Sequence, residues 1–248
     1  EDRSIDLYDG EVLYVDNAVA ELVEALKDEG VLDDTLVIVT SDHGEQLGQH
    51  GIWGHAGLHE PVIRVPLIMR CPGKLPGGLR VRGYAQHADI VPTVLELAGI
   101  SVDYKFDGVS LLSLIRGEGS REFAVCETWG ERCIIRGEWK LIVHYEAELK
   151  ALPEVFPQPY RLREYALKWP LKTLLERVRG EDGVGYELYN LKEDPMETEN
   201  LAEEERDVLS ELRALLDEWV NRHVEPGRDP MLHLEQYTQP QPIDYQRL

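Results

Sequence analysis

Apolar residues recur at helical spacing near the start of the chain, between Tyr8 and Lys27. The positions that share this spacing are Val12, Val15, Val19, Leu22, Val23 and Leu26. Steps of three and four residues place them on one face of a helix, and Gly30 is a suitable stop. The run "TLVIVT", Thr35 to Thr40, is almost continuously apolar, which is typical of a strand buried on both faces of a sheet. A helix followed by a buried strand favours an α/β fold.

The same alternation of strand and helix continues to about residue 119. "VPLIMR", Val65 to Arg70, predicts a second strand, and the turn-rich loop "CPGKLPGG" follows it. "HADIVPTVLELAGI" then predicts a helix that packs against the sheet. Asp89 suits its N-cap, Pro92 falls in the tolerated first turn, and Gly99 suits the position after its end.

The pattern changes after about Gly119. "FAVCETW" and "RCIIRGEWKLIVHY" predict antiparallel strands, with Arg136-Gly137-Glu138 as a hairpin turn. "GYELYNL" predicts a further strand, and "KEDPMETEN" a turn. Asn200 is a candidate cap for the helix that follows, whose apolar stripe comprises Val208, Leu209, Leu212, Leu215, Leu216, Trp219 and Val220.

Two segments have a different character. Residues 151–179 are interrupted by proline and then helical, with the basic residues Arg161, Arg163, Lys168, Lys172, Arg177 and Arg179. We interpret these as a solvated helix face, although they could instead grip an anionic substrate or a partner. The tail from Pro226 is rich in Pro and Gln without a period, which predicts an extended arm. The expected division is an α/β portion at 1–119, a small α+β portion at 120–223 and a tail at 224–248.

Composition narrows the classes of function. The chain has 248 residues, 43% of them hydrophobic and 29% charged, which is ordinary for a soluble globular protein. Its net charge of −21 argues against nucleic-acid binding, because phosphate backbones require clustered Lys and Arg. No window approaches the roughly 20 apolar residues of a membrane helix. The 3 cysteines are irregularly spaced, so they predict no disulfide framework and favour the cytoplasm.

The beginning of the chain, "EDRSIDLYDG", has neither an initiator Met nor an apolar signal segment. We therefore expect either a mature terminus or a fragment of a longer protein. Any targeting signal would lie upstream, so the expectation of a cytoplasmic location rests on the cysteines alone.

Candidate chemistry begins in "TSDHGEQLGQHG", directly after the first predicted strand. Asp42 and His43 stand where the carboxyl end of that strand meets a loop, the place where α/β sheets bind ligands. A carboxylate and an imidazole are both usable ligands for a divalent cation, and the loop glycines allow a close approach. Alternatively, Asp42 caps a turn and His43 is a hydrogen-bonded histidine. The local pattern leaves both interpretations open.

Two further histidines, His55 and His59, follow four residues apart. Gly57 lies between them and Pro61 follows, so a zinc-binding helix is not expected. His55 in "WGHAG" could contact an anion or remain a solvated loop residue. In the same region we expect His50 to fix the loop through a hydrogen bond. For Arg64, which could pair with Glu60 or hold the loop, we also favour a structural role.

No covalent nucleophile is recognisable. Cys71, Cys126 and Cys133 lack a nearby base in any pattern that indicates a reactive thiol. The sequence also lacks G-x-S-x-G, a P-loop and the dinucleotide-binding glycine fingerprint.

Five motifs in order resemble the sulfatase family, within the alkaline-phosphatase-like superfamily. They are "DDTLVIVTSDHGEQLGQHGIWG", "IRVPLIMRCPG", "DIVPTVLELAGI", "FDGVSLLSLIRGE" and "YELYNLKEDPMETENLA". The matches run in order from about residue 8 to about residue 220. The resemblance implies part of an alkaline-phosphatase-like sheet with flanking helices, followed by a small α+β C-terminal domain with antiparallel strands and a long helix.

The resemblance also implies a function, the hydrolysis of sulfate monoesters. In this family a calcium ion holds the sulfate against a formylglycine made from Cys or Ser. Asp42 and His43 match two of the metal ligands. His55 stands where many sulfatases have a Lys that contacts the sulfate and the leaving-group oxygen. It is therefore the expected catalytic and substrate-binding residue, for a small-molecule or glycan sulfate ester.

Departures from the family pattern keep alternatives open. "WGHAG" replaces "WGKG", so a phosphoester or phosphonate hydrolase that uses Mn²⁺ or Zn²⁺ remains an alternative. The nucleophile motif C/S-x-P-x-R does not occur in these residues, and neither do the upstream acidic metal ligands. We therefore expect the C-terminal half of a sulfatase, inactive by itself. A non-catalytic module that forms a homo-oligomer or another assembly is the third alternative.

Overall fold

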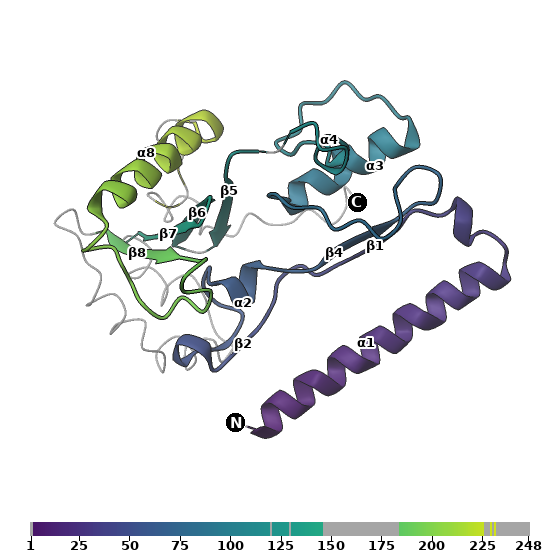
Figure 1. The fold of residues 1–248 in the computed structure, drawn as a ribbon, viewed down its shortest axis with the longest axis horizontal. Helices are drawn as coiled ribbons and strands as arrows, with labels where there is room; N and C mark the ends of the chain where they lie inside the picture. The colour runs from purple at the N-terminus through teal and green to yellow at the C-terminus, as the bar shows by residue number, and fades with distance from the viewer. Residues whose placement is uncertain are drawn as a thin grey trace, which may run out of the picture. The chain divides into compact units, whose positions relative to one another are not determined.

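The computed structural model describes residues 2–119, 121–128, 130–145, 184–225, 229 and 231 (Figure 1). The chain divides into two compact units. The N-terminal unit comprises residues 1–56 and 61–124, and the C-terminal unit comprises residues 57–60 and 125–248. The predicted segment 151–179 and most of the predicted arm from Pro226 lie outside the described residues. The predicted portions 1–119, 120–223 and 224–248 remain predictions.

The N-terminal unit begins with the helix α1 (Asp2–Asp28), which is longer than the pattern predicts. Of its helix-spaced apolar residues, Val19, Val23 and Leu26 are half-buried. Leu22 and the apolar residues nearer the N-terminus are exposed. A short 3₁₀ turn, η1 (Leu32–Asp34), follows the helix. The periodicity therefore predicted the helix itself correctly, whereas its apolar face is only partly covered.

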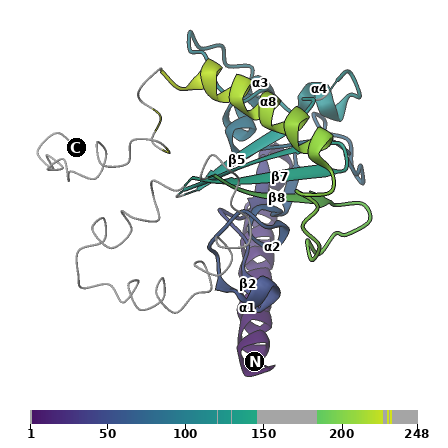
Figure 2. The ribbon, with the colours of Figure 1, turned by 90° about the vertical axis from the view of Figure 1, so that its left-hand side faces the viewer.

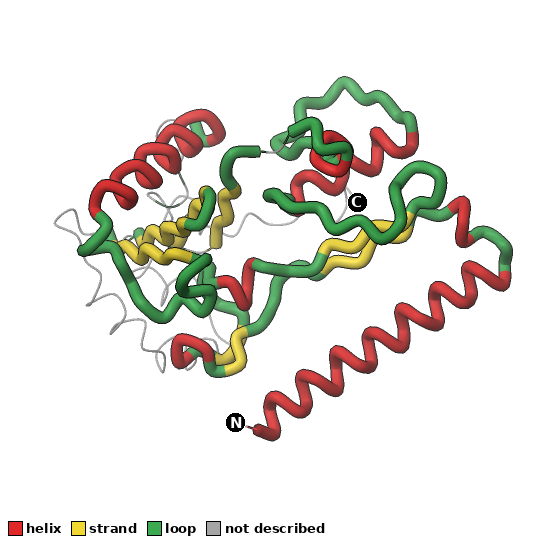
Figure 3. Tube along the Cα trace, in the orientation of Figure 1, coloured by secondary structure: helices red, strands yellow, loops and turns green. Residues whose placement is uncertain are grey.

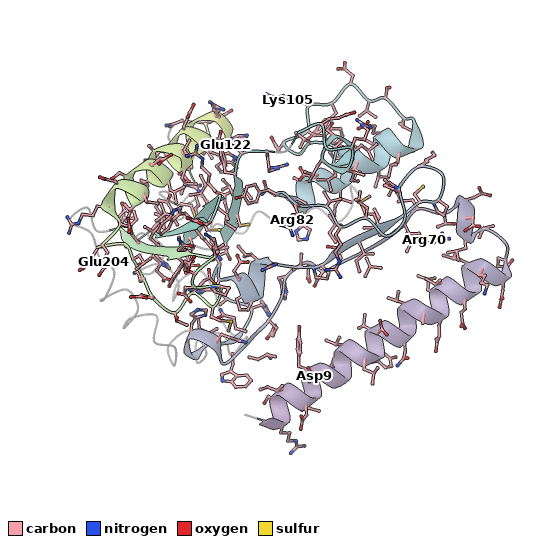
Figure 4. All side chains as sticks on the ribbon, in the orientation of Figure 1. Asp9, Arg70, Arg82, Lys105, Glu122 and Glu204 are labelled. Carbon is pink, nitrogen blue, oxygen red and sulfur yellow. The ribbon has the colours of Figure 1, made fainter. Side chains whose placement is uncertain are left out.

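A two-stranded antiparallel ribbon carries the candidate site. Strand β1 (Val37–Thr40) pairs with β4 (Leu67–Arg70), so that Thr40 lies opposite Leu67 (Figure 3). Both strands were predicted, but burial on both faces was wrong for β1, whose residues are half-buried or exposed. At the other end of the ribbon, Arg70 donates hydrogen bonds to the Leu32 carbonyl and to Asp33 (Figure 4).

Short elements follow β1 and surround the site. They are β2 (Gln46–Leu47), η2 (Gln49–Gly51), β3 (Trp53–Gly54) and α2 (Glu60–Ile63). Strands β2 and β3 form a small antiparallel hairpin in which Gln46 lies opposite Gly54. The chain after β1 thus turns back on itself and brings residues ten apart in sequence close together.

The predicted helix near residue 90 is present. It comprises η3 (His87–Asp89) and α3 (Ile90–Ala98), with α4 (Leu112–Ile115) further along the chain. Gly99 ends α3 in the left-handed conformation, at φ 69°, as predicted. The side chain of Asp89 does not cap α3. Its buried carboxylate instead accepts the N–H groups of Gln86 and Val109 and pairs with Arg121.

The C-terminal unit contains a four-stranded antiparallel sheet in the order β5-β6-β7-β8. The strands are β5 (Ala124–Thr128), β6 (Glu131–Arg136), β7 (Trp139–His144) and β8 (Gly185–Asn190). Arg136 pairs with Trp139, which confirms the predicted hairpin turn. Helix α8 (Arg206–His223) packs on this sheet through Leu212 and Leu216 (Figure 2).

Asn200 does not cap α8, contrary to the prediction. Its side-chain carbonyl accepts the Leu188 N–H of β8 at 2.9 Å, and its amide donates to the Tyr186 carbonyl at 3.1 Å. Asn200 therefore ties the turn to the sheet edge, because two backbone groups of β8 are within its reach.

No helix among the described residues is long and apolar enough to cross a membrane.

Candidate metal and substrate site

Asp42 and His43 follow directly after β1, where the chain leaves the ribbon. The exposed carboxylate of Asp42 accepts the His43 backbone N–H at 2.9 Å. This hydrogen bond, followed by the charge interaction with the His43 ring, lowers the pKa of Asp42 below its ordinary value. Asp42 therefore presents an anionic oxygen to solvent at neutral pH.

The hydrogen bonds of His43 fix which ring nitrogen can bind a cation. Its Nδ1 lies 2.9 Å from the carbonyl oxygen of Gly44, an acceptor, so Nδ1 carries the proton. In the neutral ring, Nε2 then holds the lone pair, 3.6 Å from Oδ2 of Asp42. A metal-bound histidine usually donates its other N–H to a carbonyl or carboxylate in this way. The two residues therefore fit the ligand roles that the sequence predicts.

Gly44 lies directly against the backbone of helix α2. Its N–H donates to the Val62 carbonyl at 2.7 Å. A Cβ atom at this position would lie 2.0 Å from the Pro61 carbonyl oxygen, far inside van der Waals contact. The close approach explains why the residue after His43 is a glycine, and it fixes the direction in which Asp42 and His43 leave the strand.

The β2–β3 hairpin brings His55 to the same place. The register that pairs Gln46 with Gly54 places Glu45 opposite His55. Nδ1 of His55 lies 3.3 Å from Oε2 of Glu45. The rings of His43 and His55 are stacked, with centroids 4.1 Å apart. Pairing across the hairpin thus brings two of the predicted site residues into direct contact.

Gln46 and His50 hold this hairpin together. The buried Gln46 side chain donates to the Ala56 carbonyl at 2.9 Å, and its carbonyl oxygen lies 2.9 Å from Nδ1 of His50. His50 adopts the left-handed conformation, at φ 56°. The expectation that His50 fixes the loop through a hydrogen bond is confirmed.

Two neighbours of the site, Glu45 and His87, were not recognisable from the sequence. Glu45 was not recognised because its contact with His55 depends on the hairpin register, which "GEQLGQHGIWGH" does not display. His87 lies far along the chain, yet its Nε2 is 2.8 Å from the Ser41 carbonyl. The sequence offers one signal for the contact between Glu45 and His55, which is that both residues are equally distant from the middle of the loop between β2 and β3.

His59 belongs to a different environment from His55. It is buried in the C-terminal unit, where Nε2 donates to Glu187 at 3.0 Å. Glu187 also accepts hydrogen bonds from His144 and Tyr189. Helix α2 begins at Glu60, after both histidines, and the partners of His55 and His59 are different.

His144 and Glu187 are a buried charge pair. Burial alone would lower the pKa of His144, but hydrogen bonds to Glu131 and Glu187 outweigh it and raise the pKa to about 10. Burial alone would raise the pKa of Glu187, but hydrogen bonds from His144 and His59 hold it well below its ordinary value. Both groups are therefore charged at neutral pH.

Lys140 is another buried charge of this unit. Its ammonium group lies 2.6 Å from Glu197 and 3.3 Å from Glu60. Glu197 also accepts the backbone N–H of Glu60 at 2.6 Å. These contacts, with that of His59, fasten the segment Gly57–Glu60 to the C-terminal sheet. Of these charged residues, Lys140 and Glu197 were not predicted from the sequence to have a structural role.

Comparison with known proteins identifies the family. The sulfatase family model matches residues 1–100. A choline-sulfatase from Rhizobium meliloti (strain 1021) is 32% identical over 207 residues, which are 82% of this chain and 34% of that protein. An arylsulfatase K from Mus musculus is 30% identical over 173 residues, 62% of this chain and 31% of that protein. The chain thus spans about a third of the length of these relatives.

Solved structures show the same fold. A structure in complex with its substrate D-glucosamine-2-N,6-O-disulfate has a TM-score of 0.65 at 24% identity, over 88% of this chain and 40% of that chain. The phosphonate monoester hydrolase of Agrobacterium radiobacter has a TM-score of 0.58 at 25% identity, over 83% of this chain and 38% of that chain. The solved structures add the likeness in fold. The family model and the sulfatase relatives place the chain in the sulfatase family, of the alkaline-phosphatase-like superfamily.

Proposed function

We propose that this chain supplies part of the metal and substrate site of a sulfuric ester hydrolase. The substrate class is a sulfate ester of a small molecule or glycan. The observation that carries the proposal is the convergence of Asp42, His43 and His55 at the end of β1, with the two histidine rings 4.1 Å apart. Membership of the sulfatase family supports the type of reaction.

Asp42 and His43 are the proposed ligands of a divalent cation. The exposed Asp42 carboxylate and Nε2 of His43 offer one oxygen and one nitrogen side by side. Ca²⁺ is the cation that the family resemblance implies, and Mn²⁺ or Zn²⁺ are alternatives because imidazole suits transition metals. When bound, such a cation supplies positive charge that stabilises the transferred group.

His55 is the proposed partner of the substrate. Glu45 accepts the hydrogen of Nδ1, so the opposite nitrogen, Nε2, faces away from this carboxylate. In the protonated ring, Nε2 can donate a hydrogen bond to the sulfate or a proton to the departing oxygen. Glu45 would meanwhile keep the ring in the orientation that this transfer needs.

The nucleophile is proposed to be a formylglycine supplied by residues outside this sequence. The motif C/S-x-P-x-R does not occur in the 248 residues. The 248-residue chain alone should therefore show no sulfatase turnover, even though it carries residues of the site.

The test uses the protein encoded by the complete reading frame, assayed with p-nitrophenyl sulfate. His55→Gln should lower kcat about 100-fold or more, the loss expected for a general acid. Asp42→Asn should lower both the bound cation per protein and the turnover. His223→Gln, on α8, serves as the matched control. Full activity of both site variants, or turnover by the 248-residue chain alone, would contradict the proposal.

A phosphoester or phosphonate hydrolase is the second candidate. The imidazole ligand of His43 and the similarity to a phosphonate monoester hydrolase favour it. The complete protein should be assayed in parallel with sulfate, phosphate and phosphonate esters of p-nitrophenol, after its metal content has been measured. A kcat/KM that is highest for the sulfate ester supports the first candidate, and one highest for a phosphorus ester supports the second.

A further inference from the structure

We propose that His43, Glu45 and His55 form a binding site for a divalent transition-metal ion of the Zn²⁺ type. This site shares His43 with the proposed Ca²⁺ ligands but uses Glu45 and His55 in place of Asp42. The inference rests on the same loop as the proposed function, and it requires neither the nucleophile nor turnover.

The three side chains already place their ligand atoms close together. One ligand atom of each residue lies within 4.8 Å of those of the other two. Oε2 of Glu45 and Nδ1 of His55 are 3.3 Å apart. Ligand atoms at 2.0–2.1 Å from a tetrahedral zinc ion are separated by about 3.4 Å. Metal binding first has to release the proton that Nδ1 of His55 donates to Glu45. Once it is released to solvent, this contact has the spacing that two ligands of one ion require.

The local hydrogen bonds prepare His43 for the same ion. Because Nδ1 of His43 donates to the Gly44 carbonyl, Nε2 is the nitrogen with the available lone pair. A backbone carbonyl behind a ligating histidine fixes its tautomer and its ring orientation. The contact with the Gly44 carbonyl therefore directs Nδ1 of His43 to the backbone and leaves Nε2 as the nitrogen that can bind an ion.

Binding requires one adjustment of the side chains. The rings of His43 and His55 are stacked at an interplanar angle of 26°, so their nitrogens do not yet point at a common centre. His55 has 61% of its side chain exposed and stands at the end of β3, where rotation about its side-chain bonds meets little resistance. A small rotation of the His55 side chain, together with a matching movement of Glu45, directs the ligand atoms of all three residues to one centre.

The types of ligand select the ion. Two imidazoles and one carboxylate are a known ligand set of open zinc sites, in which water takes the fourth position. Ca²⁺ instead prefers six to eight oxygen ligands. Zn²⁺, which binds nitrogen ligands well, should therefore prefer the set His43, Glu45 and His55. Binding of Ca²⁺ should instead depend on the Asp42 carboxylate.

Occupation of this site has a consequence for the proposed reaction. A Zn²⁺ ion held here would take His43 away from the Ca²⁺ position and His55 away from the substrate. Zn²⁺ at this site should therefore inhibit the complete protein, and the inhibition should be reversed by a chelator that prefers Zn²⁺ over Ca²⁺.

The experiment is a calorimetric titration of the 248-residue chain with ZnCl₂. We expect one saturable site whose affinity falls by more than about tenfold in Glu45→Gln and in His55→Ala, a loss at least as large as that of an outer-shell partner. Asp42→Asn, next to the site, and His223→Ala, on α8, should both retain the affinity of the parent chain. Circular dichroism spectra check that each variant is folded.

Co²⁺ provides an independent readout of the ligands. A tetrahedral Co²⁺ complex with His43, Glu45 and His55 should show intense visible absorption, which Glu45→Gln and His55→Ala should weaken. The proposal is overturned if Zn²⁺ does not bind to the folded parent chain, or if neither variant changes the affinity. Equal losses in Asp42→Asn and His55→Ala would also overturn it, because Zn²⁺ would then depend on the Ca²⁺ ligand. None of these measurements involves sulfatase activity, so the proposed function can fail separately.

Discussion

Gly44 is the residue of the site loop with the least space around it. Replacing it with Ala would place a methyl group 2.0 Å from the Pro61 carbonyl oxygen. Because backbone has to move to relieve this clash, Gly44→Ala should lower the free energy of unfolding by about 1–3 kcal/mol. Chemical denaturation measures the change. Gly77→Ala is the matched control, since nothing lies within 4 Å of the added atom; equal stability of the two variants would contradict the geometry.

Lys140 is a buried cation between two carboxylates, Glu197 and Glu60. In Lys140→Met, both acids lose the compensating ammonium charge while Glu197 stays buried, so the free energy of unfolding should fall by about 3–5 kcal/mol. Lys192→Met is the comparison, because Lys192 pairs with Glu138 at the surface and should contribute less than about 1 kcal/mol. If the two variants have similar denaturant midpoints, burial of the lysine does not determine the loss of stability.

At the scale of elements, β7 and α1 should respond very differently to the same substitution. Leu141 of β7 is fully buried, so Leu141→Ala should cost about 2–5 kcal/mol of unfolding free energy. Leu22 of α1 is 59% exposed, and Leu22→Ala should change it by no more than about 0.5 kcal/mol. Thermal unfolding of both variants gives the comparison. A large loss in Leu22→Ala would mean that α1 is covered in solution.

The sequence predicted most elements because their periodicity is local. The helical spacing after Tyr8, the hairpin around Gly137 and the stripe on α8 all depend on neighbours within a few residues. The predicted burial of β1 failed because the coverage of a strand depends on segments that its own residues do not encode. The capping roles of Asp89 and Asn200 failed for the related reason that each side chain bonds to the backbone of a distant segment. Asp89 accepts the Val109 N–H, and Asn200 bonds to Leu188 and Tyr186 of β8.

The site was predictable in part. Asp42 and His43 are adjacent in sequence, so they could be predicted to lie together without knowledge of the fold. His55 was predicted from the family resemblance. Glu45 was missed because only the register of the β2–β3 hairpin places it opposite His55. Lys140 and Glu197 were missed because charged residues in a sequence normally indicate surface, and their pairing joins positions 57 residues apart.

At the scale of the whole molecule, pH should act through the buried pair of His144 and Glu187. The raised pKa of His144 means that its stabilising effect is complete below its ordinary value of 6.5 and is lost as the pH rises through about 10. The lowered pKa of Glu187 means that its effect is present above its ordinary value of 4.5 and is lost as the pH falls. The pair should therefore stabilise the protein most in the weakly acidic range between these values.

The variant His144→Gln tests this dependence. Its deficit in unfolding free energy relative to the parent chain should be largest near pH 6 and should shrink steadily toward pH 10, because the parent chain then loses the charge of His144. Urea denaturation at several pH values measures the deficit. A deficit that grows with rising pH would show that His144 is neutral in the folded protein.

The segment Gly57–Glu60 belongs to the C-terminal unit, although the residues on both sides of it belong to the N-terminal unit. The protein therefore cannot be cut into two consecutive pieces that each keep their own contacts. A separately expressed piece starting at residue 125 would keep His144 and Glu197 but lack His59, the second imidazole on Glu187, and Glu60, the second carboxylate beside Lys140. Dissection for crystallisation or for split-protein complementation has to supply this tetrapeptide to the C-terminal piece, for example as a grafted loop or a synthetic peptide.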